Sequence, residues 1–260
     1  MIDIHSHILW NVDDGPKTKE ETLQILEQAV LEGITEIIST SHSNHPQYHA
    51  NYKHVQNKLH ILQYDLIQQN IPLTLHSGHE VRLSDSIIPQ YRSNRLHTLA
   101  NSNYLLLELP SYTVPHYTKM IIRELLSEGV TPIIAHPERN KAIAERPELL
   151  EALIREGALA QVTAGSLAGH FGRAIQRLSL DLVKANLVHT YGSDVHNLSS
   201  RPFYFDKGLL YLEKRKQLDA VDMLLENNSR IIRNKPMILQ EPEKIERAKW
   251  WQILRYSKAE

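Results

Sequence analysis

Short apolar runs in this chain end repeatedly in a histidine or a carboxylate. The polar residues that close six such runs are His5 and His7, His42, Glu80, Glu108, His136, and Asp194 with His196. Parallel strands that are buried on both faces have this short, continuously apolar character. Because the carboxyl ends of parallel strands meet on one side of a sheet, the pattern predicts one site built from distant segments, as in an α/β barrel.

Helical segments alternate with the apolar runs. Thr18 and Glu21 form a capping box that opens a helix, and Gly33 stands where that helix should end. Further helices are expected over 53–69, 117–128, from Pro147 to Gly157 and over 173–185. The seven expected strands are 1–4, 35–40, 72–77, 104–109, 131–135, 159–163 and 187–191. This alternation predicts an α/β fold made of parallel strand–helix units.

The last part of the chain is less patterned. Residues 229–239 are expected to hold a short element, and residues 241–258 a terminal helix. No linker, low-complexity tract or internal repeat interrupts the sequence, so we expect a single domain over 1–260, with 241–260 as its terminal helix or tail. This tail is basic and contains Trp250 and Trp251, so membrane contact is conceivable there, although packing on the domain is the more common arrangement.

Composition excludes several classes of protein. The chain has 260 residues, a formal net charge of -1 and no cysteine. Disulfides, thiolate metal sites and a cysteine nucleophile are therefore impossible, and nucleic acid is not an expected partner. No apolar run approaches the roughly 20 residues that cross a bilayer, and the first residues read as a strand rather than a signal peptide. We therefore expect a cytoplasmic protein; its oligomeric state is not predicted.

The residues at the strand ends suit a divalent metal site. His5 and His7 alternate along an extended chain, so both imidazoles can point the same way. Glu80 and Glu108 follow apolar strands, where a carboxylate is costly to bury unless it is paired or metal-bound. Nitrogen and oxygen ligands without sulfur favour Mn, Fe or Zn, and the number of ligands suits two or three ions. Taken alone, each of these residues could equally be a satisfied polar group.

The motifs together resemble a known family. They are His5-Ser6-His7, Asp13-Asp14-Gly15-Pro16, Ser41-His42, Gly78-His79-Glu80, Glu108, Ala135-His136-Pro137-Glu138-Arg139 and Gly192-Ser193-Asp194-Val195-His196-Asn197. In this order they resemble the polymerase-and-histidinol-phosphatase (PHP) metallohydrolases. Residues 162–167 and Arg201-Pro202-Phe203 narrow the likeness to the metal-dependent bacterial protein-tyrosine phosphatases of capsule and exopolysaccharide loci, the CpsB/CapC family.

The resemblance implies a fold and a ligand set. The fold is a distorted (β/α)7 barrel of the PHP type, similar to a TIM barrel, with its metals at the carboxyl ends of the strands. The ligands implied for three Mn²⁺ ions are His5, His7, Glu80 and Asp194 for the first; Glu80, Glu108 and His136 for the second; and Asp14, His42 and His196 for the third. Asp13 would not be a ligand, although an acidic pair at a turn is more often a helix cap. His79, where the family more often has Gln or Ala, would face away from the metals.

The function that the resemblance implies is phosphotyrosine-protein phosphatase. The substrate would be the phosphorylated tail of a membrane-associated bacterial tyrosine kinase in capsule or exopolysaccharide regulation. A metal-bridging hydroxide is expected to attack phosphorus, and Arg139 and Arg201 are the candidates for binding the phosphate. Tyr48 and Tyr52 are further candidates for stacking on the phenyl ring. The alternatives are a small-molecule phosphoesterase of the histidinol-phosphatase type and a non-catalytic module that binds phosphorylated tails.

Overall fold

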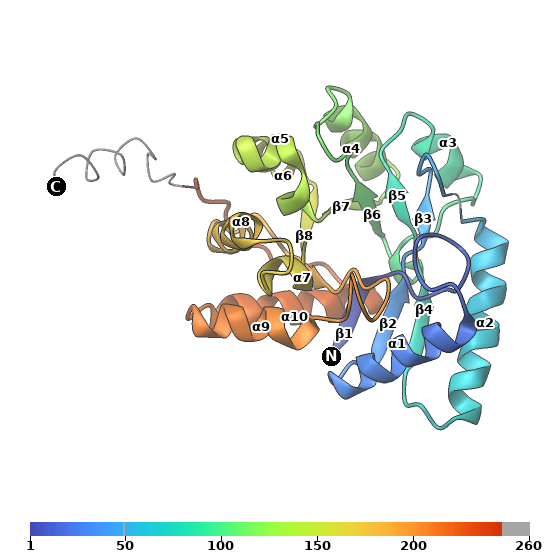
Figure 1. The fold of residues 1–260 in the computed structure, drawn as a ribbon. Helices are drawn as coiled ribbons and strands as arrows, with labels where there is room; N and C mark the ends of the chain where they lie inside the picture. Colours follow the sequence, from blue (N-terminus) through green and yellow to red (C-terminus); the bar gives the residue numbers. More distant parts are fainter. Residues whose placement is uncertain (49, 246–260) are drawn as a thin grey trace.

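The structure is a computed structural model that describes residues 1–48 and 50–245 (Figure 1). Two parallel sheets form its centre. The smaller has the order β1-β2-β4 and consists of β1 (Ile2–Ser6), β2 (Glu36–Ser39) and β4 (Thr74–Ser77). The larger has the order β3-β5-β6-β7-β8-β9 and consists of β3 (His42–Ser43), β5 (Glu80–Arg82), β6 (Tyr104–Glu108), β7 (Thr131–Ala135), β8 (Leu159–Thr163) and β9 (Thr190–Gly192). The predicted parallel α/β arrangement is confirmed.

Two of the seven predicted strands, 35–40 and 72–77, are each followed directly by a second short strand. The chain leaves β2 and enters β3 after Thr40 and Ser41, and it leaves β4 and enters β5 after Gly78 and His79. At the second break Gly78 packs so closely on the first sheet that an added Cβ would lie 2.9 Å from Cγ2 of Ile38. The short strands β3 and β5 were not predicted, and they carry His42 and Glu80 into the larger sheet.

Backbone contacts also join the first strand to the last. Ser6 forms a parallel bridge with Val195, the amide of Asp194 donates to the carbonyl of His5 at 2.8 Å, and the amide of His7 donates to the carbonyl of Val195 at 2.9 Å. Buried Ile4 and Ile38 of the smaller sheet belong to one apolar cluster with buried residues of the larger sheet. The two sheets therefore share a core, and their strands end on the same side.

Apart from the short β2–β3 and β4–β5 connections, helices lie between consecutive strands and cover the sheets (Figure 1). Thr18 caps α1 (Lys19–Leu31) by accepting a hydrogen bond from the amide of Glu21, as the capping box predicts. The helix α2 (Tyr52–Gln68) buries Val55, Leu59, Leu62 and Leu66, the face expected from the sequence. The others are α3 (Ile87–Arg92), α4 (Thr118–Ser127), α5 (Lys141–Glu145), α6 (Glu148–Ile154), α7 (Ala164–Leu167) and α8 (Arg173–Lys184), with the 3-10 turns η1 (Leu99–Asn101) and η2 (Pro137–Arg139).

The C-terminal part differs from the prediction. No element was expected between residues 191 and 229, but two helices, α9 (Phe205–Lys214) and α10 (Leu218–Ile232), are found there, and only the end of α10 coincides with the short element expected over 229–239. Two buried asparagines fix α10: Asn228 donates to the carbonyls of Ile2 and Tyr191, and Asn227 donates to that of His189. Residues 241–245 are not helical, and the rest of the predicted terminal helix, with Trp250 and Trp251, lies outside the described residues. In the described part of the chain, no helix has the length and apolarity that crossing a bilayer requires.

Candidate metal centre

All nine predicted ligand residues gather at the carboxyl ends of the strands. They come from the end of β1 (His5, His7), the loop before α1 (Asp14), β3 (His42), β5 (Glu80), β6 (Glu108), the residue after β7 (His136) and the segment after β9 (Asp194, His196). Each side chain except that of Asp14 is almost completely withdrawn from solvent. Ionisable groups gathered this densely need a compensating partner.

The first predicted ligand set forms a compact group. Nε2 of His5 lies 3.5 Å from a Glu80 oxygen and 3.2 Å from Oδ1 of Asp194. Nε2 of His7 lies 3.3 Å from the other Glu80 oxygen and 3.5 Å from Oδ1 of Asp194. Five potential ligand atoms, from four residues on three separate segments, therefore face one common space.

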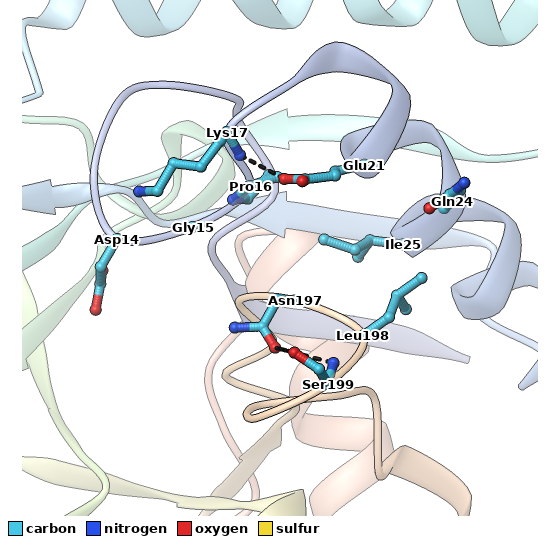
Figure 2. A pocket seen from close by; sticks show the side chains of 10 residues that line it. All are labelled: Asp14, Gly15, Pro16, Lys17, Glu21, Gln24, Ile25, Asn197, Leu198 and Ser199. Atoms are coloured by element: carbon cyan, nitrogen blue, oxygen red, sulfur yellow. Dashed lines mark hydrogen bonds between the residues drawn. The ribbon is translucent and has the colours of Figure 1, made fainter.

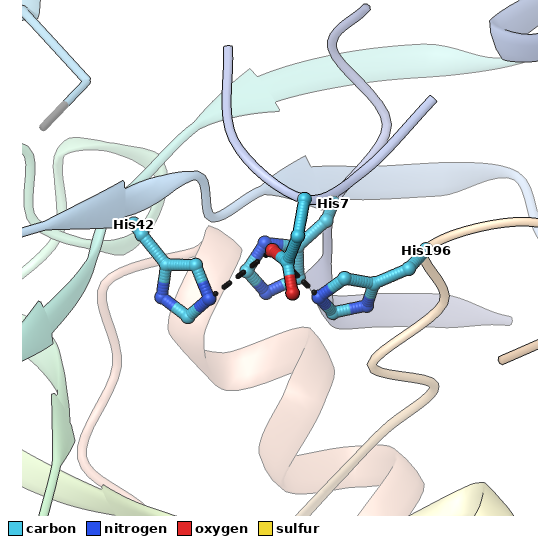
Figure 3. A group of neighbouring side chains, drawn as sticks. His7, His42 and His196 are labelled. Carbon is cyan, nitrogen blue, oxygen red and sulfur yellow. Dashed lines mark ion pairs between the residues drawn. The ribbon is translucent and has the colours of Figure 1, made fainter. Parts of the chain in front are cut away.

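The third predicted set also gathers. Oδ1 of Asp14 lies 3.4 Å from Nε2 of His42 and 3.3 Å from Nε2 of His196. The ring of His7 stacks on that of His196 with 3.8 Å between centroids, so this group has four members (Figure 3). His7 therefore lies between the first and the third groups.

The second predicted set is arranged differently. Glu80 contacts Nε2 of His136 at 2.7 Å and Nδ1 of His42 at 3.0 Å, so it does lie centrally. Glu108, however, groups with His42 and Glu80 rather than with His136. The reason is Arg82, which lies directly opposite Glu108 in the strand register and takes one of its oxygens at 2.8 Å.

The site passes a direct test of fit for cations. Asp194 Oδ1, Asp14 Oδ1, Glu108 Oε2 and His196 Nε2 are buried atoms that have no hydrogen-bond partner in the described part of the chain. Leaving a polar atom in that state normally costs about 1–3 kcal/mol. Nitrogen and oxygen lone pairs that converge in this way suit divalent ions such as Mn, Fe or Zn.

The ring orientations of the histidines support the same interpretation. Nδ1 of His7 lies 3.0 Å from the carboxylate of Asp13, and Nδ1 of His5 lies 2.9 Å from Oε1 of Gln161. Nδ1 of His196 similarly lies 2.9 Å from the carbonyl of Asp194. An Nδ1–H that donates to oxygen leaves the Nε2 lone pair free for a metal. Asp13 therefore orients a ligand and is not placed as one.

Two positioning residues were missed from the sequence. Gln161 is buried in the apolar strand β8, and a lone amide in such a run is a usable signal. Asp3 accepts hydrogen bonds from the amide (2.9 Å) and the hydroxyl (2.6 Å) of Ser193, which ties β1 to the segment that carries Asp194. Burial raises the pKa of Asp3 to about 6, although these hydrogen bonds oppose the rise.

The backbone is strained at two of the predicted ligands. His136 has φ of 33° and Asp194 has φ of 55°, both in the left-handed region that non-glycine residues seldom occupy. Each such residue costs about 1–3 kcal/mol, and the surrounding fold must maintain it. Strain of this kind clusters at functional sites, because it directs a side chain where regular structure would not.

The charges of the site are set by its own neighbours. Burial disfavours the ionised form of Asp194, but the guanidinium groups of Arg201 and Arg139 hold its pKa well below the usual range. Burial likewise opposes the charge on His42, and Glu80 with Asp14 nevertheless raises its pKa to about 11. The Asp194 carboxylate is therefore ionised at neutral pH, as cation binding requires of a carboxylate ligand.

Both predicted arginines reach the rim of this cluster. Arg201 donates to Oδ2 of Asp194 at 2.7 Å and to Oδ2 of Asp14 at 3.3 Å, while Arg139 donates to the same Asp194 oxygen. The guanidinium of Arg139 also lies 4.9 Å from the centre of the Phe171 ring. Glu138, which precedes Arg139 in the chain, accepts hydrogen bonds from the amide and the hydroxyl of Thr163.

A pocket of about 450 Å³ opens beside the cluster and shares Asp14 with it (Figure 2). One wall is the loop before α1 with Lys17, and the other is the loop with Asn197 and Leu198. Ile25 of α1 lies at its base, so the pocket has both apolar and polar walls. The metal cluster is therefore open to an extended ligand on this side.

The two tyrosines considered for ring stacking have different surroundings. Tyr52 stacks on His97 with 3.6 Å between centroids and is used in packing. Tyr48 stacks on His45, and both stack on the candidate ligand His42 at the edge of the cluster. His79 faces away from the centre, as expected, and accepts a hydrogen bond from the amide of His97.

Comparison with known proteins shows the family of this chain. The family model described as "Capsular polysaccharide synthesis, CpsB/CapC" matches residues 1–233. The chain belongs to the CpsB/CapC family. CapC of Staphylococcus aureus is 38% identical to it over 255 residues, which cover 98% of this chain and 100% of CapC. The tyrosine-protein phosphatase YwqE of Bacillus subtilis is 38% identical over 249 residues, which cover 96% and 98%.

Solved structures agree with this membership. A crystal structure reported for YwqE of Bacillus subtilis and CpsB of Streptococcus pneumoniae, described as metal-dependent tyrosine phosphatases, matches this chain with a TM-score of 0.92 and 38% identity. The match covers 95% of this chain and 100% of that one. A β-aspartyl dipeptidase of Fervidobacterium islandicum matches with a TM-score of 0.51 at 12% identity, covering 95% of this chain and 78% of the other, which is a likeness in fold alone.

Proposed function

We propose that this CpsB/CapC protein is a metal-dependent phosphotyrosine-protein phosphatase. The observation that carries the proposal is the cluster itself. Potential ligand atoms from separate strand ends come together there, several of them buried and without a hydrogen-bond partner in the described residues. Two arginines contact the same cluster. Family membership and the named phosphatase relatives support it. The metal is proposed to be manganese, in two or three ions per chain, with iron or zinc as alternatives.

Each group of side chains has a proposed role. The metal ligands are His5, His7, Asp14, His42, Glu80, Glu108, His136, Asp194 and His196. Divalent ions held in such a site supply Lewis-acid activation of water and neutralise phosphoryl charge. Asp13 and Gln161 keep His7 and His5 in the tautomer that directs Nε2 toward the ions.

Arg139 and Arg201 are proposed to bind the phosphate. Both guanidinium groups end on one oxygen of Asp194, so their donors converge on a point at the rim of the metal cluster. A planar guanidinium matches two phosphoryl oxygens at once, which an ammonium group does not. The ring of Phe171 packs against the guanidinium of Arg139 and so limits the orientations that the arginine side chain can take.

A protein substrate agrees with the openness of the site. The side chains of Asp14 and Arg201 are 35% and 26% exposed, and the adjoining pocket leaves room for residues next to a phosphotyrosine on one side of the cluster. A metabolite phosphatase, such as the histidinol-phosphatase type, would instead be expected to close over its substrate. Because the chain has no cysteine, a thiolate nucleophile is excluded, and phenolate leaves readily enough that we assign no general acid.

The biological setting follows from the family. We propose that the substrate is the phosphorylated tail of a membrane-associated bacterial tyrosine kinase, and that its dephosphorylation regulates capsule or exopolysaccharide synthesis in the cytoplasm. We also propose that the two sheets are parts of one distorted (β/α)7 barrel and that the chain is a single domain. The shared apolar cluster and the bridge between Ser6 and Val195 support that view.

A comparison of substrates tests this proposal. A phosphotyrosyl peptide, the matching phosphoseryl peptide and histidinol phosphate are assayed separately with Mn²⁺ supplied. We expect kcat/KM to be highest for the phosphotyrosyl peptide. A preference for histidinol phosphate would identify a metabolite phosphatase, and failure to turn over any phosphomonoester would leave a binding module instead of an enzyme.

A further inference from the structure

A second polar groove lies away from the metal cluster, between α8 and α9. Its volume is about 480 Å³, and its floor includes Leu180 of α8. The charged and aromatic residues that line it are Arg173, Arg177, Asp181, Lys184, Tyr211 and Arg215. Four cations therefore face one carboxylate, on a chain whose formal net charge is -1.

These cations are only weakly paired with the protein's own carboxylates. Arg177 lies 3.9 Å from Asp181, and Arg215 rests on the ring of Tyr211. Within residues 1–48 and 50–245, neither Arg173 nor Lys184 forms a salt bridge. Like charges gathered without partners repel one another, and an anionic ligand would remove that repulsion.

Three exposed arginines elsewhere on the surface are paired with carboxylates. Arg92 pairs with Glu128 at 2.5 Å, Arg123 with Glu156 at 2.8 Å and Arg155 with Glu151 at 2.9 Å. The groove differs from these positions because its cations are gathered along one concavity.

The groove begins close to the catalytic centre. Arg173 is the first residue of α8, and only Gly172 separates it from Phe171, whose ring carries the guanidinium of Arg139. From there α8 runs for 12 residues, about 18 Å along its axis. About five or six residues of extended chain would span that length.

We infer that the α8–α9 groove binds an acidic segment of the same polypeptide whose phosphotyrosine occupies the catalytic centre. The inference rests on the proposed function and adds a recognition site outside the catalytic residues. A concave groove fits an extended acidic chain better than a membrane, which is usually met by a convex face with exposed apolar residues. The contacts are solvent-exposed ion pairs, so they should weaken with salt.

The test uses two pairs of phosphotyrosyl peptides, and the two peptides of a pair differ only in charge. In each pair, one peptide carries six glutamates and the other carries six glutamines. These residues precede the phosphotyrosine in the first pair and follow it in the second. For wild type we expect a lower KM for a glutamate peptide than for its glutamine counterpart, with a difference that shrinks at high salt. In the double variant Arg177→Glu/Arg215→Glu, we expect the KM of that glutamate peptide to rise about tenfold.

Controls separate charge recognition from damage to the fold. The kcat for p-nitrophenyl phosphate and the KM of the glutamine peptides should not change in the double variant. Arg155→Glu breaks a similar i,i+4 pair on another helix and should leave every KM as in wild type. The milder Arg177→Gln/Arg215→Gln should raise the same KM by a smaller factor, which keeps the test valid if the double glutamate variant does not fold.

Several outcomes would overturn the inference. One is a ratio of the KM of the glutamate peptide to that of its glutamine counterpart that is the same in both double variants as in wild type. Another is a rise in the KM of the glutamate peptide in Arg155→Glu that equals the rise in the double variants. If the double variants lost binding to phosphatidylglycerol vesicles while their KM for the peptides stayed unchanged, the groove would be a membrane contact instead. If wild type hydrolysed no phosphotyrosyl peptide, the proposed function would fail, while anisotropy of a fluorescein-labelled hexaglutamate peptide would still test the groove, with weaker binding expected for the double variants.

Discussion

Asp13 shows how much of the proposed metal site depends on residues that are not among its proposed ligands. Its carboxylate contacts Nδ1 of His7 at 3.0 Å and accepts hydrogen bonds from the amides of Gly15 (2.9 Å) and His42 (3.1 Å). Asp13 therefore holds the Nδ1 proton of His7 and the backbone of His42 in position at the same time.

The substitution Asp13→Asn keeps the shape of this side chain and removes its charge. Asn has one acceptor oxygen in place of two, so its side chain cannot serve all three donors, and the His7 tautomer is no longer fixed by a carboxylate. Loss of such a partner behind a metal-ligating histidine typically costs 10–100-fold in metal affinity. We therefore expect the apparent affinity for Mn²⁺ to fall by that factor, equivalent to about 1.4–2.7 kcal/mol.

The assay is a titration of turnover against free Mn²⁺ with a phosphotyrosyl peptide. The midpoint should move to higher Mn²⁺ in Asp13→Asn, and kcat at saturating metal should recover most of the wild-type value. Asp65→Asn removes a surface carboxylate that pairs with Lys19, so its midpoint should match wild type. A wild-type midpoint in Asp13→Asn would refute the assignment of Asp13 as the residue that orients His7.

Three further predictions follow from other parts of the structure. In Arg201→Ala, kcat/KM for a phosphotyrosyl peptide should fall about 10²–10³-fold, the usual loss for a transition-state donor, and a wild-type value would exclude a role in binding phosphate. Burial lowers the pKa of His189 to about 4, below its unfolded value, so the stability due to this histidine is present above about pH 6.5 and is lost as the pH falls toward 4. When the pH is lowered from 7.5 to 5, the free energy of unfolding measured with urea should therefore fall by about 2 kcal/mol more in wild type than in His189→Gln. An equal fall in both proteins would contradict the lowered pKa of His189. In Gly208→Ala the new Cβ would stand 2.1 Å from the hydroxyl of Tyr191, so unfolding free energy should drop by about 1–3 kcal/mol, and an unchanged urea midpoint would disprove the clash.

The sequence predicted those parts of the fold that repeat a simple physical pattern. The strands β6, β7 and β8 coincide with apolar runs, because strands covered on both faces need apolar side chains throughout. The apolar face of α2 was predicted at its four buried positions, because the period of a helix determines which residues share a side. The gathering of ligand residues was predictable because parallel strands bring their ends together.

Other features depend on contacts that no local pattern records. The breaks that separate β2 from β3 and β4 from β5 arise where the chain passes from one sheet to the other, and Gly78 marks one of them only once Ile38 is seen beside it. The helix α10 is anchored through Asn227 and Asn228, which look like surface residues in the sequence. The pairing of Glu108 with Arg82 follows from strand register, which the spacing of residues along the chain does not reveal.

The most direct test of the metal centre is the activity of protein stripped of its ions. Metal-free protein prepared by chelation is assayed on a phosphotyrosyl peptide while Mn²⁺ is added back and the bound metal is counted. We expect negligible turnover before addition and recovery that saturates at two or three ions per chain. Full turnover in protein shown to hold no metal would contradict the claim that these converging histidines and carboxylates form the catalytic centre.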